Sequence, residues 1–166
     1  MHLPTGEELQ SHIKKKHPQD ASETFHYRRV QIKPTETKPL DPYIVVDGDN
    51  VAYFDSDKPL AKNLKCTYFQ VKKLGYTPIM FVSATLRHTI DSTLELVRMI
   101  NLNWVIETEE GEDEDIFIIK EAQSKNCDII SNNNYKKYID QYNRDDWSLK
   151  SSLRKFKFED RKLVFM

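Results

Sequence analysis

The sequence predicts a three-layer α/β/α domain built around a central, mainly parallel sheet. Short apolar runs rich in β-branched residues alternate with longer segments of helical periodicity, and two strand-like segments close the chain. Strands that alternate with helices of ten or more residues imply right-handed crossovers, which place helices on both faces of a parallel sheet. The 166 residues, of which 39% are hydrophobic, are enough for one packed domain of this kind.

Four strands of this sheet are expected, at residues 43–46, 77–83, 104–107 and 127–131. The first, YIVV, is a short β-branched run that stops at the polar segment DGDN, as a buried strand does at its loop. The other three are also apolar, so the sheet is expected to be covered on both faces.

Three helices are expected between these strands, at residues 58–75, 88–101 and 113–126. The first is closed by Gly75, a residue typical of the position after a helix, and the third carries acids in its first turn. The segments FKFED and KLVFM are predicted to form a C-terminal β-hairpin with Asp160 and Arg161 at its tip.

Residues 1–42 are expected to be an N-terminal extension or linker, and residues 43–166 the folded domain. The first part holds five of the seven prolines, with a short helical pattern at residues 7–16 and a strand-like stretch, FHYRRVQI. The sequence has neither the ~20 consecutive apolar residues of a membrane span nor the apolar centre of a secretory signal. Cys66 and Cys127 fit no disulfide or zinc spacing. We therefore expect a cytoplasmic protein that makes no use of a membrane.

Charge is unevenly distributed along the chain, although the net charge is only −1. Seven acids lie among the nine residues 107–115, whereas basic residues gather at 14–16, 28–29, 136–137 and 154–157. Since the net charge gives no global attraction to a polyanion, binding of one must depend on this distribution. The pattern suits a polyanion held by a basic rim over an acidic, metal-loaded centre.

Polar side chains follow the predicted strands, at the edge of a parallel sheet where ligands collect. These positions are DGDN at 47–50, SATLRH at 83–88, the acidic run that ends at Asp115, and SNNNY at 131–135. Carboxylate and amide oxygens are the ligands that Mg²⁺ and Mn²⁺ prefer, and such an ion polarises a phosphodiester and activates water. The sequence therefore predicts an acidic metal site at the strand ends.

Each of these positions also has a purely structural interpretation. Asp47 could cap a turn with Gly48, the acidic run could be a solvated loop that favours a helix N-terminus, and residues 132–134 could cap a helix over 135–142. The acids at 114 and 115 are exceptions within the run, because they lie where the helix starts at the strand-end face.

Four segments together resemble the NYN domain of the Regnase (MCPIP) ribonucleases, which are relatives of the PIN nucleases. They are IVVDGDNVA, the DEDIFIIKEA helix, DIISNNNYKKYID and the closing DDWSLKSSLRKFKFEDRKLVFM. The specific elements are the DGxN strand end, a carboxylate pair two and three residues before Phe117, and SNxNY beginning fourteen residues after it, at Ser131. The resemblance implies a PIN-like (NYN) fold and a metal-dependent endoribonuclease that hydrolyses RNA phosphodiester bonds with Mg²⁺ or Mn²⁺.

The resemblance also implies a role for each matching residue. Asp47, Asp115 and Glu114 fall on the catalytic, metal-binding acids, and Asn133 falls where the family usually has an Asp. Asn133 offers a carbonyl oxygen without a negative charge, so metal affinity or rate is expected to be lower than in the family. Asp49 is a further candidate metal ligand that would restore this charge.

Single-stranded or stem-loop RNA is the partner that the resemblance implies. The family commonly carries a CCCH zinc finger, for which this sequence lacks the cysteines, so RNA affinity is expected from the domain surface, a targeting partner or a homo-oligomer. Basic residues would contact phosphates, and Tyr135 or Trp147 would stack on a base, although Trp147 also suits the core. The candidate RNA-binding residues are Asn50, Arg87, His88, Ser131, Asn132, Tyr135, Lys136, Lys137 and Arg144.

Two other functions are compatible with the same residues. A catalytically weak or inactive NYN domain that only binds RNA would account for Asn133. A haloacid-dehalogenase-like phosphatase would use Asp47 as nucleophile and Asp49 as general acid, with Ser83 after the next strand. However, Asn50 and Val51 stand where that phosphatase class has its usual Gly-Thr pair.

Overall fold

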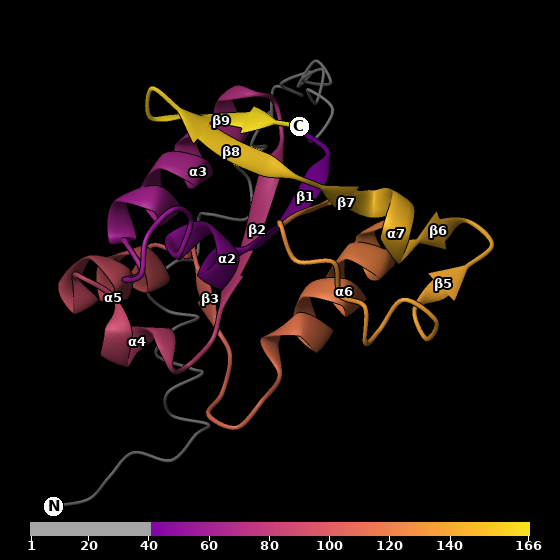
Figure 1. Ribbon diagram of the computed structural model, residues 1–166, viewed down its shortest axis with the longest axis horizontal. Coiled ribbons are helices and arrows are strands. Elements are labelled where there is room, and N and C mark those ends of the chain that lie inside the picture. The colour runs from indigo at the N-terminus through magenta and orange to yellow at the C-terminus, as the bar shows by residue number, and fades with distance from the viewer. Residues whose placement is uncertain (1–40) are drawn as a thin grey trace, which may run out of the picture. The chain divides into compact units, whose positions relative to one another are not determined.

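A five-stranded parallel sheet forms the centre of the domain. The computed structural model describes residues 41–166, so the patterns expected at residues 7–16 and 25–32 lie outside the described residues. The strand order is β3-β2-β1-β4-β7, and every neighbouring pair is parallel, as predicted. Figure 1 labels β1, β2, β3 and β7 of this sheet. The strands are β1 (Tyr43–Asp47), β2 (Thr77–Val82), β3 (Ile106–Glu107), β4 (Ile129–Ile130) and β7 (Leu153–Arg154).

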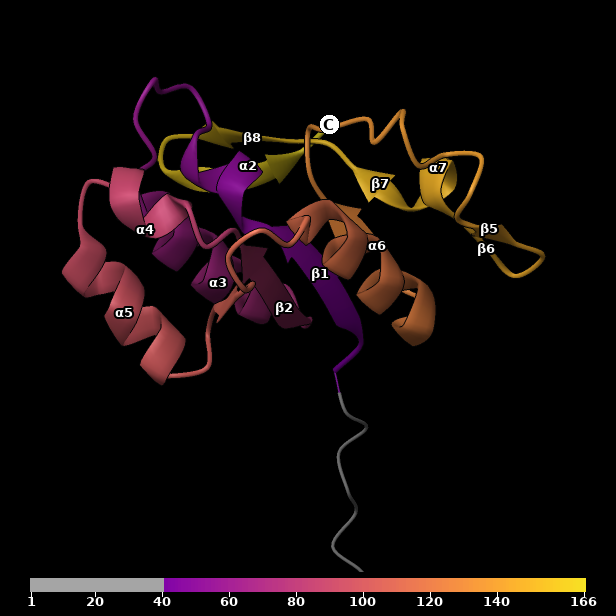
Figure 2. The same ribbon diagram turned by 90° about the horizontal axis from the view of Figure 1, so that it is seen from below.

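Helices cover both faces of this sheet, which confirms the three-layer architecture. Figure 2 shows α6 on one side of β1 and β2, with α3 and α5 on the other. Gly75, with φ +90°, follows α3 as predicted. Among residues 41–166, no helix combines the length and the apolarity needed to cross a bilayer. The helices are α2 (Gly48–Ala52), α3 (Ala61–Lys73), α4 (Leu86–Thr89), α5 (Thr93–Asn101), α6 (Glu114–Lys125) and α7 (Leu149–Ser152).

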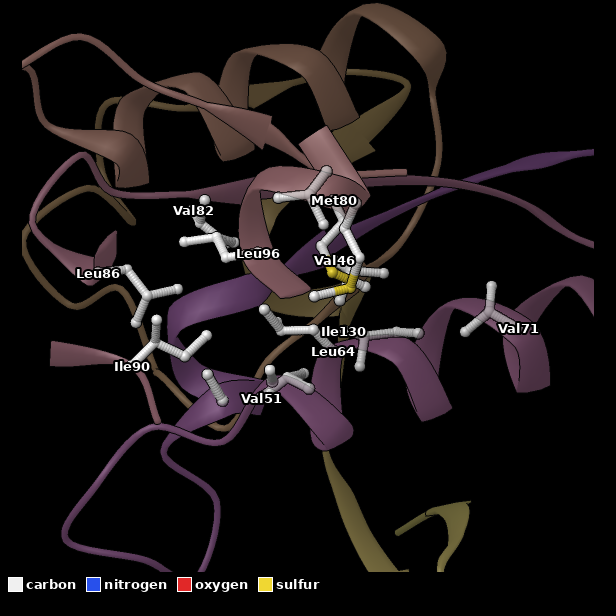
Figure 3. Close-up of a cluster of buried hydrophobic side chains, with 14 of the residues drawn as sticks. Val46, Val51, Leu64, Val71, Met80, Val82, Leu86, Ile90, Leu96 and Ile130 are labelled. Carbon is white, nitrogen blue, oxygen red and sulfur yellow. The ribbon is translucent and has the colours of Figure 1, made fainter. Parts of the chain in front are cut away.

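Successive residues of the central strands enter two different cores. Ile44 and Val46 of β1 and Ile130 of β4 pack with α3 and α5, whereas Val45 and Ile129 pack with α6. Because side chains alternate between the faces of a strand and both faces are covered, the whole of each strand is apolar. Figure 3 shows the first core, with the labelled side chains Val46, Val51, Leu64, Val71, Met80, Val82, Leu86, Ile90, Leu96 and Ile130.

The prediction of a single helix at residues 88–101 is wrong, because the structure divides this region into α4 and α5. Ser92 caps α5 by accepting a hydrogen bond from the backbone N–H of Glu95. Asp91 caps a different helix, since its Oδ1 accepts the backbone N–H of Ala61, at the start of α3, at 2.7 Å. These two polar side chains satisfy helix ends and so interrupt the helical periodicity.

The predicted C-terminal hairpin is present as β8 (Phe156–Glu159) and β9 (Lys162–Phe165). Its tip residues Asp160 and Arg161 both have positive φ, 47° and 63°, as a two-residue type I′ turn requires. Side chains of α3 hold this tip, because Cys66 Sγ and Gln70 Nε2 both donate to the carbonyl oxygen of Arg161, at 3.0 and 2.8 Å. A further small antiparallel pair, β5 (Asn143–Arg144) with β6 (Trp147–Ser148), follows the SNNNY segment.

Candidate functional site

Asp47 is a buried carboxylate at the junction between β1 and α2. Its side chain is 4% exposed and accepts three hydrogen bonds. Oδ1 accepts from the backbone N–H of Asn50 at 3.1 Å, and Oδ2 accepts from Ser131 Oγ at 2.8 Å and from the Tyr135 hydroxyl at 2.6 Å. Burial raises the pKa of Asp47, while the three donors act in the opposite direction. Since a carboxylate has about four acceptor positions, Oδ1 keeps one free for a ligand.

Gly48 allows α2 to begin directly against β2. A Cβ at this position would lie 2.5 Å from the carbonyl oxygen of Phe81 and 2.6 Å from Cγ1 of Val82. The carbonyl belongs to the sheet backbone and cannot move without disturbing the pairing of β1 with β2. Glycine is therefore required between Asp47 and Asp49.

The Gly48→Ala substitution is expected to lower the free energy of unfolding by about 3 kcal/mol, because the methyl group overlaps backbone atoms. Urea denaturation measures this change. Gly111→Asn is the control for backbone strain without steric overlap, because no atom lies within 4 Å of a Cβ placed there while its φ of 84° is one that side-chain-bearing residues rarely adopt. An unchanged urea midpoint for Gly48→Ala would show that the close approach of α2 to β2 is not required.

Asp49 connects the end of β1 to the end of β2. Its Oδ1 accepts the backbone N–H of Ser83 at 2.9 Å, and its Oδ2 accepts the Ser83 hydroxyl at 2.5 Å. Burial is the main cause of its raised pKa, and the charge of Asp47 adds to it. Asp49 is thus held in place as a second acid beside Asp47.

The N-terminus of α6 supplies the remaining acids of the site. Asp113 caps the helix through the N–H of Asp115, while Glu114 and Asp115 occupy its first turn. Burial, followed by the charges of Asp47, Glu114, Asp113 and Asp49, raises the pKa of Asp115 to about 7. Burial and the charges of Asp49, Asp47 and Asp113 also raise the pKa of Glu114. Two separate parts of the chain therefore bring Asp47, Asp49, Glu114 and Asp115 into one electrostatic field, and these four are called the acidic cluster below.

The acidic cluster fits a hard divalent cation in its donor chemistry. All its donors are carboxylate oxygens, and the mutual repulsion that raises their pKa values would be offset by a positive ion. Within residues 41–166, no three acidic, histidine or cysteine side chains are arranged to ligate one ion together. A Mg²⁺ site commonly uses only one or two protein carboxylates and is completed by water and phosphate oxygens.

The SNNNY segment forms a fixed loop beside Asp47. Asn50 Oδ1 accepts the backbone N–H of Asn132 at 2.8 Å, and the Asn132 side chain pairs with both the N–H and the carbonyl of Phe156 at 2.9 Å. Asn133 Oδ1 accepts the N–H of Tyr135 at 2.9 Å. The helix considered over residues 135–142 is absent and turns replace it, because Tyr135 has a left-handed backbone with φ 48°. Asn50 and Asn132 thus position the loop.

Two residues expected to contact RNA are instead internal supports of Asp47. Ser131 is fully buried and Tyr135 is 2% exposed, and both hydroxyls donate to Asp47. Tyr135 is therefore no stacking platform for a base. Burial and the charge of Asp47 raise its pKa, so the phenol stays protonated and remains a donor. Trp147 is buried and donates to the Cys127 carbonyl, which confirms its place in the core.

The expected basic contacts lie in different places. Arg87 forms a two-point ion pair with Glu107, at 2.9 and 3.1 Å, while His88 and Lys136 are exposed. Lys137 reaches the rim of the acidic cluster, with its Nζ 3.8 Å from Oδ2 of Asp113. Arg144 is exposed and donates to the carbonyl of Gln123, in the C-terminal half of α6 and so toward the opposite end of that helix from Asp115.

Lys155 belongs to the site although the sequence did not single it out. Its Nζ donates to the carbonyl oxygens of Asn132 and Asn133, both at 2.9 Å, and to Oδ1 of Asn134 at 2.8 Å. Partial burial lowers its pKa. The only sequence signal for it was the basic run at 154–157. Lys155 stabilises the loop that carries Asn133.

A family model matches the sequence, and solved structures share the fold. The family model described as the Zc3h12a-like ribonuclease NYN domain matches residues 41–166. A crystal structure of nuclear proteinaceous RNase P 2 (PRORP2) from A. thaliana is similar with a TM-score of 0.59 and 15% identity, over 75% of this chain and 29% of that one. A second PRORP2 structure from Arabidopsis thaliana is similar with a TM-score of 0.58 and 15% identity, over 76% of this chain and 30% of that one. The likeness shows the fold, and the chain spans under a third of those proteins. No curated protein matches.

The family match also decides against the phosphatase alternative. The matched family covers all of the described residues and includes the acidic cluster and the SNNNY loop. The chain belongs to the Zc3h12a-like ribonuclease NYN domain family, the Regnase type.

Proposed function

We propose that the domain is a divalent-cation-dependent endoribonuclease that cuts RNA at the acidic cluster. The observation that carries this proposal is the meeting of acids from β1, α2 and α6 in one electrostatic field, within a ribonuclease fold. Mg²⁺ or Mn²⁺ is the proposed cofactor, since carboxylates suit hard cations. Cytoplasmic RNA is the proposed substrate, bound by the domain's own surface, by a homo-oligomer or with the help of a targeting partner.

The residues of the site have separate proposed roles. A bound divalent cation supplies charge that stabilises the phosphodiester during hydrolysis. Asp47, fixed by its three donors, and Asp115 are the proposed direct ligands, and Asp49 and Asn133 are proposed to contact the ion through metal-bound water. Burial and the charges of Asp49, Asp47 and Asp113 raise the pKa of Glu114, which makes its carboxylate a stronger base, and we assign it the role of accepting a proton from the attacking water.

The proposed activity is tested with a labelled stem-loop RNA and the matching DNA, each with and without Mg²⁺ or Mn²⁺. We expect internal cuts in RNA that require the cation, stop with a chelator and return when the cation is restored. DNA should be cut at least tenfold more slowly. RNA cleavage that continues unchanged in the chelator would contradict the proposed metal dependence.

A second candidate function is RNA binding without cleavage, which the presence of Asn133 in place of the usual Asp favours. This function is tested by the same RNA. Binding without any cation-dependent product would support it, whereas cation-dependent products would exclude it.

Asn133→Asp is expected to leave RNA cleavage equal or raise it, by up to about tenfold at limiting Mg²⁺. A carboxylate can still accept the Tyr135 N–H, and it adds negative charge for the cation. Initial cleavage rates against Mg²⁺ concentration measure the effect. Asn134→Asp is the matched control, because it adds the same charge where the side chain contacts Lys155. A marked drop in rate for Asn133→Asp alone would mean that the amide itself is needed.

A further inference from the structure

A cavity of about 560 Å³ lies between the loop after α2, the helix α3 and the C-terminal hairpin. Phe54 and Phe158 form an aromatic wall of this cavity, with ring centroids 5.3 Å apart in an edge-to-face arrangement, and both rings also pack against the first core. Both rings are partly exposed. We call this cavity the hairpin groove. An aromatic wall of this kind is a surface on which an unpaired base can stack.

Positive charge borders the hairpin groove. Lys62 of α3 and Arg161 of the hairpin tip both line it, and both are exposed. Neither forms an ion pair with another of the residues 41–166. Asp55 is the one acid among the lining residues. Cations beside an aromatic wall suit single-stranded nucleic acid, because the cations bind phosphates and the aromatic rings stack on bases.

The hairpin groove is connected to the acidic cluster on two sides. The helix α2 begins directly after Asp47 and ends just before Phe54, and five helical residues span roughly 7.5 Å. Asn63, another lining residue, donates to the carbonyl of Val51 in α2 at 3.3 Å. The second connection is the pairing of Asn132 with Phe156, which places the start of β8 beside the SNNNY loop. An RNA strand bound at the acidic cluster can therefore reach the hairpin groove within a few nucleotides.

We propose that the hairpin groove is a binding subsite for one unpaired nucleotide of the RNA, its base against Phe54 and Phe158 and its phosphate near Lys62 and Arg161. The proposal rests on the proposed function for RNA as the ligand, but not on cleavage. A base in a duplex has no free face to stack, so this subsite selects single-stranded or loop RNA over duplex.

Binding of a fluorescein-labelled nine-nucleotide oligouridine, measured by anisotropy in a chelating buffer, tests the hairpin groove without any cleavage. Lys62→Gln and Arg161→Asn should each raise the Kd about threefold to tenfold and flatten its salt dependence, since a single-strand phosphate contact contributes a slope of about 0.7. Asparagine suits the positive φ of Arg161. Asp55→Asn should lower the Kd. Lys65→Gln, an exposed residue of α3 outside the groove lining, should change it less than twofold.

Cys66 provides a footprint of the same site, because it lines the hairpin groove and is partly exposed. The oligouridine should slow its alkylation by N-ethylmaleimide at least fivefold. Cys127 is the internal reference, because it lies outside the groove lining and burial raises its pKa to about 11. Its slow alkylation should not change with RNA.

The results separate the two proposals. The proposed nucleotide subsite would be overturned if the Kd values of Lys62→Gln and Arg161→Asn were unchanged and Cys66 were alkylated equally fast with and without RNA. Expected binding and footprinting without any cation-dependent cleavage would overturn the proposed nuclease activity and still support the groove.

Discussion

Replacing Asp115 with asparagine is expected to stabilise the metal-free domain while it removes most of the cation-dependent RNA cleavage. Burial and neighbouring carboxylates raise the pKa of Asp115 to about 7, so the ionised form is unfavourable in the folded state at neutral pH. Asparagine has the same shape without the charge. We expect a gain of about 1 to 2 kcal/mol at pH 8, a value reduced to allow for solvent screening of this half-buried group.

The pH dependence of this gain has a definite sign. A carboxyl whose pKa is raised in the folded state binds protons more tightly there, so its contribution to stability is full below its unfolded pKa near 4 and is lost as the pH rises to about 7. The wild-type free energy of unfolding in a chelating buffer should therefore fall over this range more than that of Asp115→Asn. Asp140→Asn, at an exposed acid, is the control. A destabilised Asp115→Asn protein at pH 8 would contradict the expected repulsion.

Asp47→Asn is expected to lower kcat/KM for RNA on the order of a thousandfold while the domain stays folded, because a neutral amide is a poor ligand for a cation. The amide oxygen can still accept one or two of the three hydrogen bonds, so the free energy of unfolding should fall by about 1 to 2 kcal/mol, less than in a variant without any acceptor.

Asp47→Ala is the informative partner of this variant. It leaves three buried donors without an acceptor and should lower the free energy of unfolding by about 3 kcal/mol. Urea denaturation and cleavage rates on the same samples separate the structural from the catalytic effect. Near wild-type cleavage by Asp47→Asn would exclude Asp47 from catalysis.

The parallel sheet could be predicted because its pattern is local. YIVV is apolar at every position since both faces of β1 are covered, and the DGDN segment marks the point where β1 ends. The helix α6 and the hairpin carry equally local signals, an acidic first turn and a two-residue turn between apolar strands. Patterns of this kind depend on neighbours in the sequence, so they can be read without a structure.

Other features depend on partners far along the chain and so could not be predicted. The break between α4 and α5 arises partly because Asp91 caps α3, thirty residues away. β7 is only two residues long, and its pairing with β4 identifies it as a strand.

The acids of the site could be named from the sequence, but their supports could not. Ser131 and Tyr135 lie 84 and 88 residues from Asp47, and polar residues in an SNNNY pattern suit RNA contact as well as internal hydrogen bonds. Whether these residues contact RNA or form internal hydrogen bonds depends on the path of the loop. The left-handed backbone of Tyr135 and the hydrogen bonds of Lys155 determine that path.

Binding of Mn²⁺ to the RNA-free domain, followed through the electron paramagnetic resonance signal of the free ion, tests the central claim most directly. The wild-type protein should bind Mn²⁺ saturably above pH 7, and Asp47→Asn and Asp115→Asn should each bind it at least tenfold more weakly. Equal binding by the three proteins would contradict the assignment of these carboxylates to a metal site.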